Sequence, residues 1–296
     1  GLNSPLHSVS YSGTWGAQCF LPLDKIVTKA AEFGYDGIEI AAKRPHASPL
    51  DLDIESRKRL KDSIESKGLE IACIAAYNDF ADPHPFIREM NLLQLRETIH
   101  LAYDLGAKLV RVFASGMGNM HAGATFDEQW AWVCENLTKA AKYAEDQAIV
   151  LGLQNHSPIM HSYKNVLQMI KEVGSDSLKA VIDAPLLFMA GESVTEAVKE
   201  AGNLIVHSHT GPSDYVWGPG PLDHTIGGLR RVYTLRTFPL GKGNTNYKAF
   251  VNSLKEVGYN GFLSYEICGP VPGGGDEENL DKWAKDALVY MRGLLE

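Results

Sequence analysis

The chain contains little cysteine, and its cysteines are not grouped. Cys19, Cys73, Cys134 and Cys268 lie far apart, without C-x-x-C spacing. Thiolate zinc sites and disulfide frameworks place cysteines in short, paired spacings. The sequence therefore predicts neither a structural zinc site nor a disulfide scaffold, and a reducing, cytoplasmic location is the simplest expectation.

Long apolar runs and an excess of basic residues are also absent. No run approaches the roughly 20 apolar residues of a membrane span, and the N-terminus lacks the basic-then-apolar pattern of a signal peptide. The chain begins at Gly1 rather than at Met, so removal of an earlier signal stays open. The formal net charge is -8, whereas a nucleic-acid surface needs clustered Lys and Arg. We expect no membrane and no nucleic-acid partner, and a small neutral or anionic ligand.

What the chain does contain is a regular alternation of apolar runs and helical patterns. With 296 residues, 45% of them hydrophobic, it can bury a large core as one domain. Glycines end many of the helical patterns directly before a strand, where a residue that tolerates positive φ is wanted. Eight such repeats predict a single (β/α)8 TIM barrel over residues 1–296. The predicted strands fall within 6–11, 35–40, 69–74, 108–113, 150–157, 180–183, 204–209 and 261–266, and the helices within 23–33, 54–67, 85–105, 127–145, 163–173, 194–201, 247–257 and 281–294.

Polar side chains stand at the ends of four successive predicted strands. Gln154 follows the apolar run 150–153, Asp183 ends the next strand, His209 the one after, and Glu266 the last. In parallel barrels the carboxyl ends of the strands meet at one face, where chemistry collects. One imidazole with oxygen donors suits Mn²⁺ or Mg²⁺, with Co²⁺ or Zn²⁺ as alternatives. The spacing predicts a divalent metal site, with Mn²⁺ the first expectation and Gln154, Asp183, His209 and Glu266 as ligands.

These motifs resemble the xylose-isomerase-like sugar isomerase and epimerase superfamily. The resemblance runs over nearly the whole chain and rests on Gln154-Asn155-His156, Asp183, His207-x-His209, Gly241-Lys242-Gly243, and Gly258-Tyr259 before Glu266. It implies a TIM barrel with a divalent metal and a sugar substrate. It is weak for the substrate itself, because the superfamily includes ketose epimerases, dehydratases, lyases and abasic-site nucleases.

The chain departs from the superfamily pattern at Gln154, where the resemblance implies a glutamate. In the family's epimerases the glutamates of the fifth and eighth strands bind the metal and exchange protons on opposite faces of the sugar. A glutamine cannot titrate, so one of the two bases is lost. A histidine common three residues after the strand-six acid is here Leu186. His156 is the nearest replacement, because residues two apart in an extended chain face the same side. Alternatively, it only hydrogen-bonds a substrate hydroxyl.

A further group of residues is predicted to contact the substrate. Glu39, at the end of the second strand, could bind a sugar hydroxyl or a metal-ligating histidine. Arg44 and His46 leave that strand in the loop 43–49 and could hold a carboxylate. Aromatic residues in loops could stack on a sugar ring. The predicted substrate-binding residues are Trp15, Glu39, Arg44, His46, His207 and Lys242.

The function predicted first is a divalent-metal-dependent isomerase or epimerase of a sugar or keto sugar. Glu266 and His156 would move the proton next to the carbonyl through an enediolate. A lyase or dehydratase acting on a 3-keto-glycoside or cyclic polyol is the alternative, because elimination needs only one acid and one base. A metal-free binding barrel is a second alternative, favoured by Gln154. The long irregular stretch 210–238 is typical of active-site covers and subunit contacts, so a homo-oligomer stays open.

Overall fold

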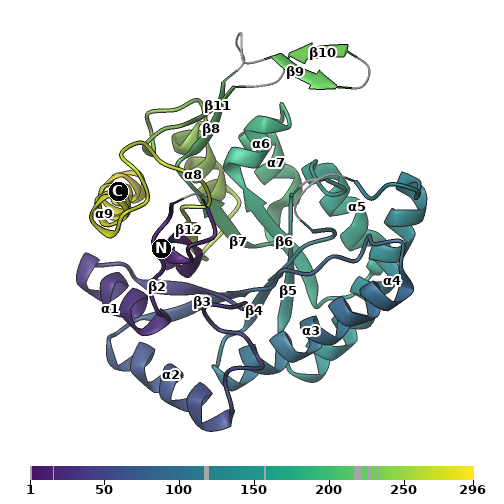
Figure 1. The fold of residues 1–296 in the computed structure, drawn as a ribbon, viewed down its shortest axis with the longest axis horizontal. Coiled ribbons are helices and arrows are strands. Elements are labelled where there is room, and N and C mark those ends of the chain that lie inside the picture. Colours follow the sequence, from purple (N-terminus) through teal and green to yellow (C-terminus); the bar gives the residue numbers. More distant parts are fainter. Residues whose placement is uncertain are drawn as a thin grey trace.

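The computed structural model describes residues 2–15, 17–116, 120–156, 158–216, 222–225, 228–231 and 234–296. Within these ranges, eight parallel strands close into a barrel in the order β1-β12-β7-β6-β5-β4-β3-β2 (Figure 1). This arrangement confirms the predicted (β/α)8 TIM barrel. The barrel strands are β1 (Pro5–His7), β2 (Gly37–Ala41), β3 (Glu70–Ala75), β4 (Leu109–Val112), β5 (Val150–Gln154), β6 (Leu178–Asp183), β7 (Ile205–Thr210) and β12 (Leu263–Tyr265).

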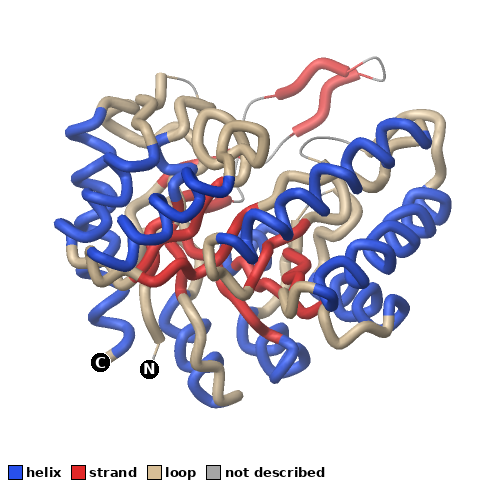
Figure 2. The backbone as a smooth tube through the Cα atoms, turned by 90° about the horizontal axis from the view of Figure 1, so that it is seen from below, coloured by secondary structure: helices blue, strands red, loops and turns tan. Residues whose placement is uncertain are grey.

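Helices surround the strands on the outside of the barrel (Figure 2). Their apolar faces pack against the strands to form a continuous core. None of the helices in the described ranges is both long and apolar enough to cross a bilayer. The helices are α1 (Leu23–Phe33), α2 (Ile54–Ser66), α3 (Pro85–Asp104), α4 (Phe126–Asp146), α5 (Tyr163–Val173), α6 (Ala184–Met189), α7 (Val194–Ala201), α8 (Tyr247–Glu256) and α9 (Glu277–Leu295).

Local sequence signals explain several boundaries. Helix α1 ends at Gly34, whose φ of 89° is in the left-handed region and turns the chain into β2. Helix α4 begins with a capping box, in which Thr125 and Glu128 satisfy each other's backbone N–H groups. Gly152 lies inside β5, where a Cβ atom would stand 2.5 Å from Cγ2 of Val181. The strand carrying Gln154 can therefore pack closely against β6 only because it has glycine there.

The structure differs from the sequence prediction in three places. The first strand is only three residues long, because Ser8–Tyr11 form a 3-10 turn whose Ser8 and Ser10 hydroxyls accept backbone N–H groups of Ala41 and Ile267. Helix α6, which the sequence pattern does not predict, has as its N-cap Asp183, one of the predicted metal ligands. The stretch 210–238 is not wholly irregular. It contains two antiparallel ladders, β8 (Ser213–Val216) with β11 (Thr234–Thr237) and β9 (Leu222–Thr225) with β10 (Gly228–Arg231), the second of which projects beyond the helices (Figures 1 and 2).

Candidate metal centre and substrate cavity

Three of the four predicted metal ligands converge at the strand ends. Asp183 ends β6, His209 is directly opposite it in β7, and Glu266 immediately follows β12. One ligand atom from each lies within 4.8 Å of the other two. His209 Nδ1 is 3.9 Å from Asp183 Oδ2 and 3.5 Å from Glu266 Oε1. We call Asp183, His209 and Glu266 the acidic cluster.

Glu39 orients the histidine of this cluster. Both carboxylate oxygens of Glu39 lie 2.9 Å from His209 Nε2, and Ser264 donates to Glu39 Oε2 over 2.7 Å. The Nε2–H group therefore donates to Glu39, and Nδ1 faces the carboxylates of the cluster. Nδ1 is buried and has no hydrogen-bond partner among the described residues. A histidine held by a carboxylate through one nitrogen, with the other nitrogen turned to a cluster of oxygens, is typical of metal ligands.

The raised pKa values of the acidic cluster reflect its crowded negative charge. Burial, together with the Glu266 charge, raises the pKa of Asp183 to about 7. Burial also raises the pKa of Glu266. Burial alone would lower the pKa of His209, but Glu39 and Glu266 outweigh it and raise that pKa to about 9. Protons on these groups offset the crowded negative charge, and a divalent cation would replace them.

Gln154 lies beside the acidic cluster but turns its amide oxygen away from it. Its Nε2 donates to Asp183 Oδ2 over 3.0 Å, while its Oε1 accepts from Arg111 Nη1 over 2.9 Å. The neighbouring Asn155 bonds both the backbone N–H and the carbonyl of Asp183, which fixes the ends of β5 and β6 together. Metal ligation by Gln154 thus stays a prediction, and it requires the amide to rotate away from Arg111.

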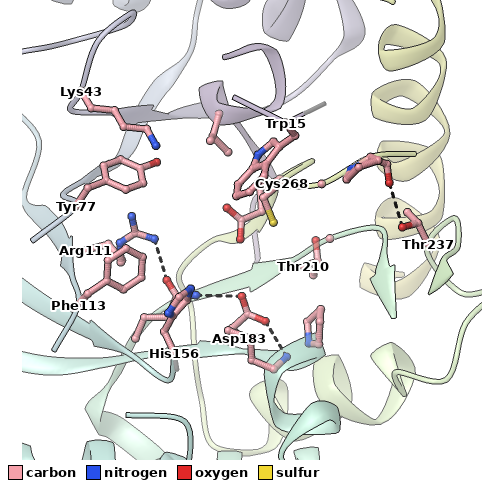
Figure 3. Close-up of a pocket in the computed structure, with 18 residues that line it drawn as sticks. Trp15, Lys43, Tyr77, Arg111, Phe113, His156, Asp183, Thr210, Thr237 and Cys268 are labelled. Atoms are coloured by element: carbon pink, nitrogen blue, oxygen red, sulfur yellow. Dashed lines mark hydrogen bonds between the residues drawn. The ribbon is translucent and has the colours of Figure 1, made fainter. Parts of the chain in front are cut away.

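A cavity of about 310 Å³ lies over the acidic cluster (Figure 3). The predicted residues Trp15 and His156 line it, together with Asp183 and Glu266. The His156 ring packs 4.5 Å, centroid to centroid, from Phe113. The cavity thus combines carboxylates, a histidine and aromatic walls, which suits a small polar ligand with carbon–hydrogen faces.

Tyr77 and Phe113, two of the loop aromatics expected to stack on a sugar ring, also line this cavity. Sequence reasoning missed three further lining residues, Lys43, Arg111 and Cys268. For Arg111 a signal was present, because a charged residue inside the apolar run of β4 must have a structural or functional reason to be buried. Lys43 gave no such signal, since its neighbour Arg44 looked equally suitable.

The structure corrects several predicted substrate contacts. Arg44 is exposed and pairs with Asp51 at 2.7 and 2.8 Å, so its charge is directed away from the cavity. His46 is buried between Ser8 Oγ and the Leu21 carbonyl, each 3.1 Å away. Lys242 borders a different cavity next to α9.

Two other predicted substrate contacts lie one layer deeper. Glu39 and His207 are fully buried behind His209, with His207 Nε2 3.3 Å from Glu39. Of the two roles predicted for Glu39, the structure therefore favours holding His209, the predicted metal ligand, over binding a sugar hydroxyl. Of the six predicted substrate contacts, Trp15 lies at the cavity.

Comparison with known proteins identifies the family of this chain. A family model described as a xylose isomerase-like TIM barrel matches residues 27–294. The chain belongs to this family. Among curated family relatives, fructoselysine 3-epimerase from Shigella flexneri is 25% identical over 288 residues, covering 93% of this chain and 94% of that protein. D-psicose 3-epimerase from Ruminiclostridium cellulolyticum is 22% identical and covers 98% of each chain.

Solved structures of sugar epimerases share the fold. D-psicose 3-epimerase with D-tagatose from Clostridium cellulolyticum H10 has a TM-score of 0.77 at 19% identity, with 100% of both chains covered. The 3-keto-D-glucoside 4-epimerase from E. coli has a TM-score of 0.74 at 16% identity, covering 99% of this chain and 100% of that one. These relatives confirm the predicted superfamily and the predicted class, an enzyme of the isomerase and epimerase type.

Proposed function

We propose that this chain is a divalent-metal-dependent epimerase or isomerase of a keto sugar. The observation that carries the proposal is the buried, unpartnered Nδ1 of His209 facing the carboxylates of Asp183 and Glu266 within the described part of the chain. Support comes from curated relatives that are named as 3-epimerases of ketoses. The chain matches these relatives over nearly their whole length.

The residues of the acidic cluster fit a hard or borderline divalent ion. Two carboxylates and one imidazole match the donor preference of Mn²⁺, and the same set accepts Mg²⁺, Co²⁺ or Zn²⁺. Gln154 would add a neutral oxygen if its amide turned. When bound, such an ion would polarise the carbonyl of a keto sugar and so acidify the neighbouring C–H bond.

The chain's own residues would carry the proton. Glu266 is only 9% exposed, and burial raises its pKa, so its carboxylate is more basic than one in water. We assign it removal of the proton next to the carbonyl. His156, which lines the same cavity, would deliver a proton to the substrate from a second position. Trp15 and Phe113 help to exclude water from these transfers.

A lyase or dehydratase is the second candidate, and Gln154 favours it. The Gln154 amide, held between Arg111 and Asp183, cannot accept a proton. Elimination needs one base next to the carbonyl and one acid at the leaving group, and Glu266 with His156 supplies both. The acid would protonate the departing oxygen rather than return a proton to carbon.

Product analysis in D₂O separates the two candidates. The purified protein would be loaded with Mn²⁺ and offered ketohexoses and 3-keto-glycosides, and products would be followed by NMR. An epimerase incorporates deuterium at the inverted carbon, whereas a lyase yields an unsaturated or cleaved product. The proposal predicts deuterium in a sugar of unchanged composition. Elimination products alone would replace it with the second candidate, and a protein that binds no divalent ion would contradict both.

A further inference from the structure

The cavity has a cationic side, which consists of Lys43, Tyr77, Arg111 and Phe113. Lys43 Nζ lies 3.8 Å from the centroid of the Tyr77 ring, and Arg111 Cζ lies 3.9 Å from that of Phe113. Figure 3 shows these four side chains in a row along one side of the cavity, with Trp15 and Cys268 on the other. Cation–π contacts orient the ammonium and guanidinium groups without neutralising their charges.

Arg111 is buried without an acidic partner among the described residues. It is 2% exposed; Nη1 donates to Gln154 Oε1 and Nη2 to the Ala76 carbonyl, each over 2.9 Å, and both acceptors are neutral. Its Nε is buried with no hydrogen-bond partner in the same part of the chain. The carboxylates of the cavity pair with histidines instead, Glu266 with His209 and His7. A buried guanidinium with neutral acceptors and an unused donor is costly unless a ligand completes it.

The amide of Gln154 keeps Arg111 available. A glutamate in the same place would lie within hydrogen-bonding distance of the guanidinium and neutralise it. With glutamine there, the two cations balance the ionised Asp183 and Glu266, and a divalent ion leaves the cavity with net positive charge. The departure of this chain from the family pattern therefore removes a negative charge next to Arg111 as well as a base.

We propose that Lys43 and Arg111 bind a carboxylate of the substrate, so that the ligand is a keto sugar acid rather than a neutral keto sugar. This inference rests on the proposed function and narrows its substrate class. A guanidinium fork and an ammonium group suit one planar carboxylate. A phosphate would call for further donors such as a helix N-terminus. The N-terminus of α6, next to the cavity, is already capped by Asp183 Oδ1, which accepts from the Leu186 N–H.

Binding of two matched ligands tests the subsite. D-fructuronate carries a carboxylate where D-fructose carries a hydroxymethyl group. Calorimetry on the Mn²⁺-loaded protein measures the affinity for each sugar. We expect D-fructuronate to bind about tenfold to a hundredfold more tightly, since hydrogen bonds to charged groups are the strong ones. Equal affinity, or a preference for D-fructose, would overturn the subsite.

Variants locate the preference within the cavity. Lys43→Gln, and separately Arg111→Lys, should reduce the preference for D-fructuronate to less than about threefold while the protein still binds Mn²⁺, because neither residue belongs to the acidic cluster. Arg44→Gln removes the same charge from the exposed neighbour and should keep the preference. A preference that survives both cavity variants contradicts the proposal.

Failure of the proposed function would look different. In that case the wild-type protein would bind neither Mn²⁺ nor either sugar, whereas failure of the subsite alone leaves Mn²⁺ and D-fructose binding intact. Because Arg111 is buried, Arg111→Lys could destabilise the fold, so its thermal unfolding is measured together with its ligand binding. Lys43 is only partly buried, so a loss of preference in Lys43→Gln does not reflect a loss of folding.

Discussion

The two sides of the cavity are built in different ways. The acidic cluster consists of residues at strand ends that other strands hold in place. His209 donates to Glu39 of β2 across the barrel, and the Asp183 backbone N–H donates to Asn155, directly after β5. The cationic side consists of Lys43 and Arg111, which rest on aromatic rings and neutral acceptors. The first side is arranged to hold a cation and the second to hold an anion. A metal ion and an acidic substrate together would satisfy both.

The largest expected effect comes from removing one charge of the acidic cluster. Asp183→Asn keeps the size of the side chain and its cap on α6, but it removes one of the two carboxylates facing His209 Nδ1. We expect Mn²⁺ affinity to fall by at least about a hundredfold and activity by more than about a thousandfold. Asp51→Asn, an exposed acid paired with Arg44, is the control. Unchanged Mn²⁺ affinity in Asp183→Asn would remove Asp183 from the metal site.

His156 lines the same cavity as both sides. Its replacement should lower the rate of the reaction but not the binding of Mn²⁺. General acid–base groups typically contribute about 10²–10⁴-fold. His156→Ala should lower kcat by that order with bound Mn²⁺ unchanged, and His156→Asn should be nearly as impaired, because asparagine hydrogen-bonds without titrating. Steady-state kinetics with metal analysis checks this. An Asn variant that keeps most of the activity would reduce His156 to a residue that positions the substrate.

Glu39→Gln tests whether metal binding by the acidic cluster depends on the carboxylate that holds His209. Glutamine can still accept from His209 Nε2–H but supplies no charge. Such changes typically reduce metal affinity by about 10–100-fold. Calorimetry with Mn²⁺ measures the loss. An unchanged affinity would mean that the ring of His209 is oriented by packing alone.

The fold and the acidic cluster could be predicted from the sequence because both depend on local patterns. Apolar runs that end in Asp183, His209 and Glu266 mark strand ends, and parallel strands bring their ends together. The cationic side could not be predicted in the same way. Whether Lys43 or Arg44 enters the cavity depends on how one loop turns, and Arg44 finds Asp51 instead. The strands β8 to β11 were missed because their stretch shows no clear alternation, and α6 because it is short and directly follows Asp183 at the end of β6.

Metal affinity should rise with pH, because the groups that titrate, Asp183 and His209, belong to the acidic cluster. The pKa of Asp183 is raised from 3.8 to about 7 and that of His209 from 6.5 to about 9, so the folded, metal-free protein holds protons that the unfolded chain releases. Stability without metal therefore falls as pH rises through both windows, and metal binding, which needs these protons removed, strengthens. From about pH 6 to about pH 8 we expect Mn²⁺ affinity to rise at least tenfold, with proton release seen by calorimetry in two buffers. A flat profile would contradict the assignment of His209 Nδ1 as a ligand.

The smallest expected effect concerns Gln154, which contacts both sides. Gln154→Glu adds a carboxylate next to Asp183, and we expect Mn²⁺ affinity to rise by up to about tenfold. The new charge also faces Arg111, so the preference for D-fructuronate should fall in the same variant. Equal or weaker Mn²⁺ affinity would mean that the introduced carboxylate pairs with Arg111 and that position 154 does not ligate the metal.

An anomalous-scattering map from crystals grown with Mn²⁺ tests the central claim most directly. The described residues include two groups of side chains able to hold an ion, Asp183 with His209 and Glu266, and Glu39 with His207 and His209. We predict one peak at roughly 2.0–2.3 Å from His209 Nδ1 and from a carboxylate oxygen of Asp183 and of Glu266. A peak on the Nε2 side, between Glu39 and His207, or no peak at the strand ends, would contradict the account.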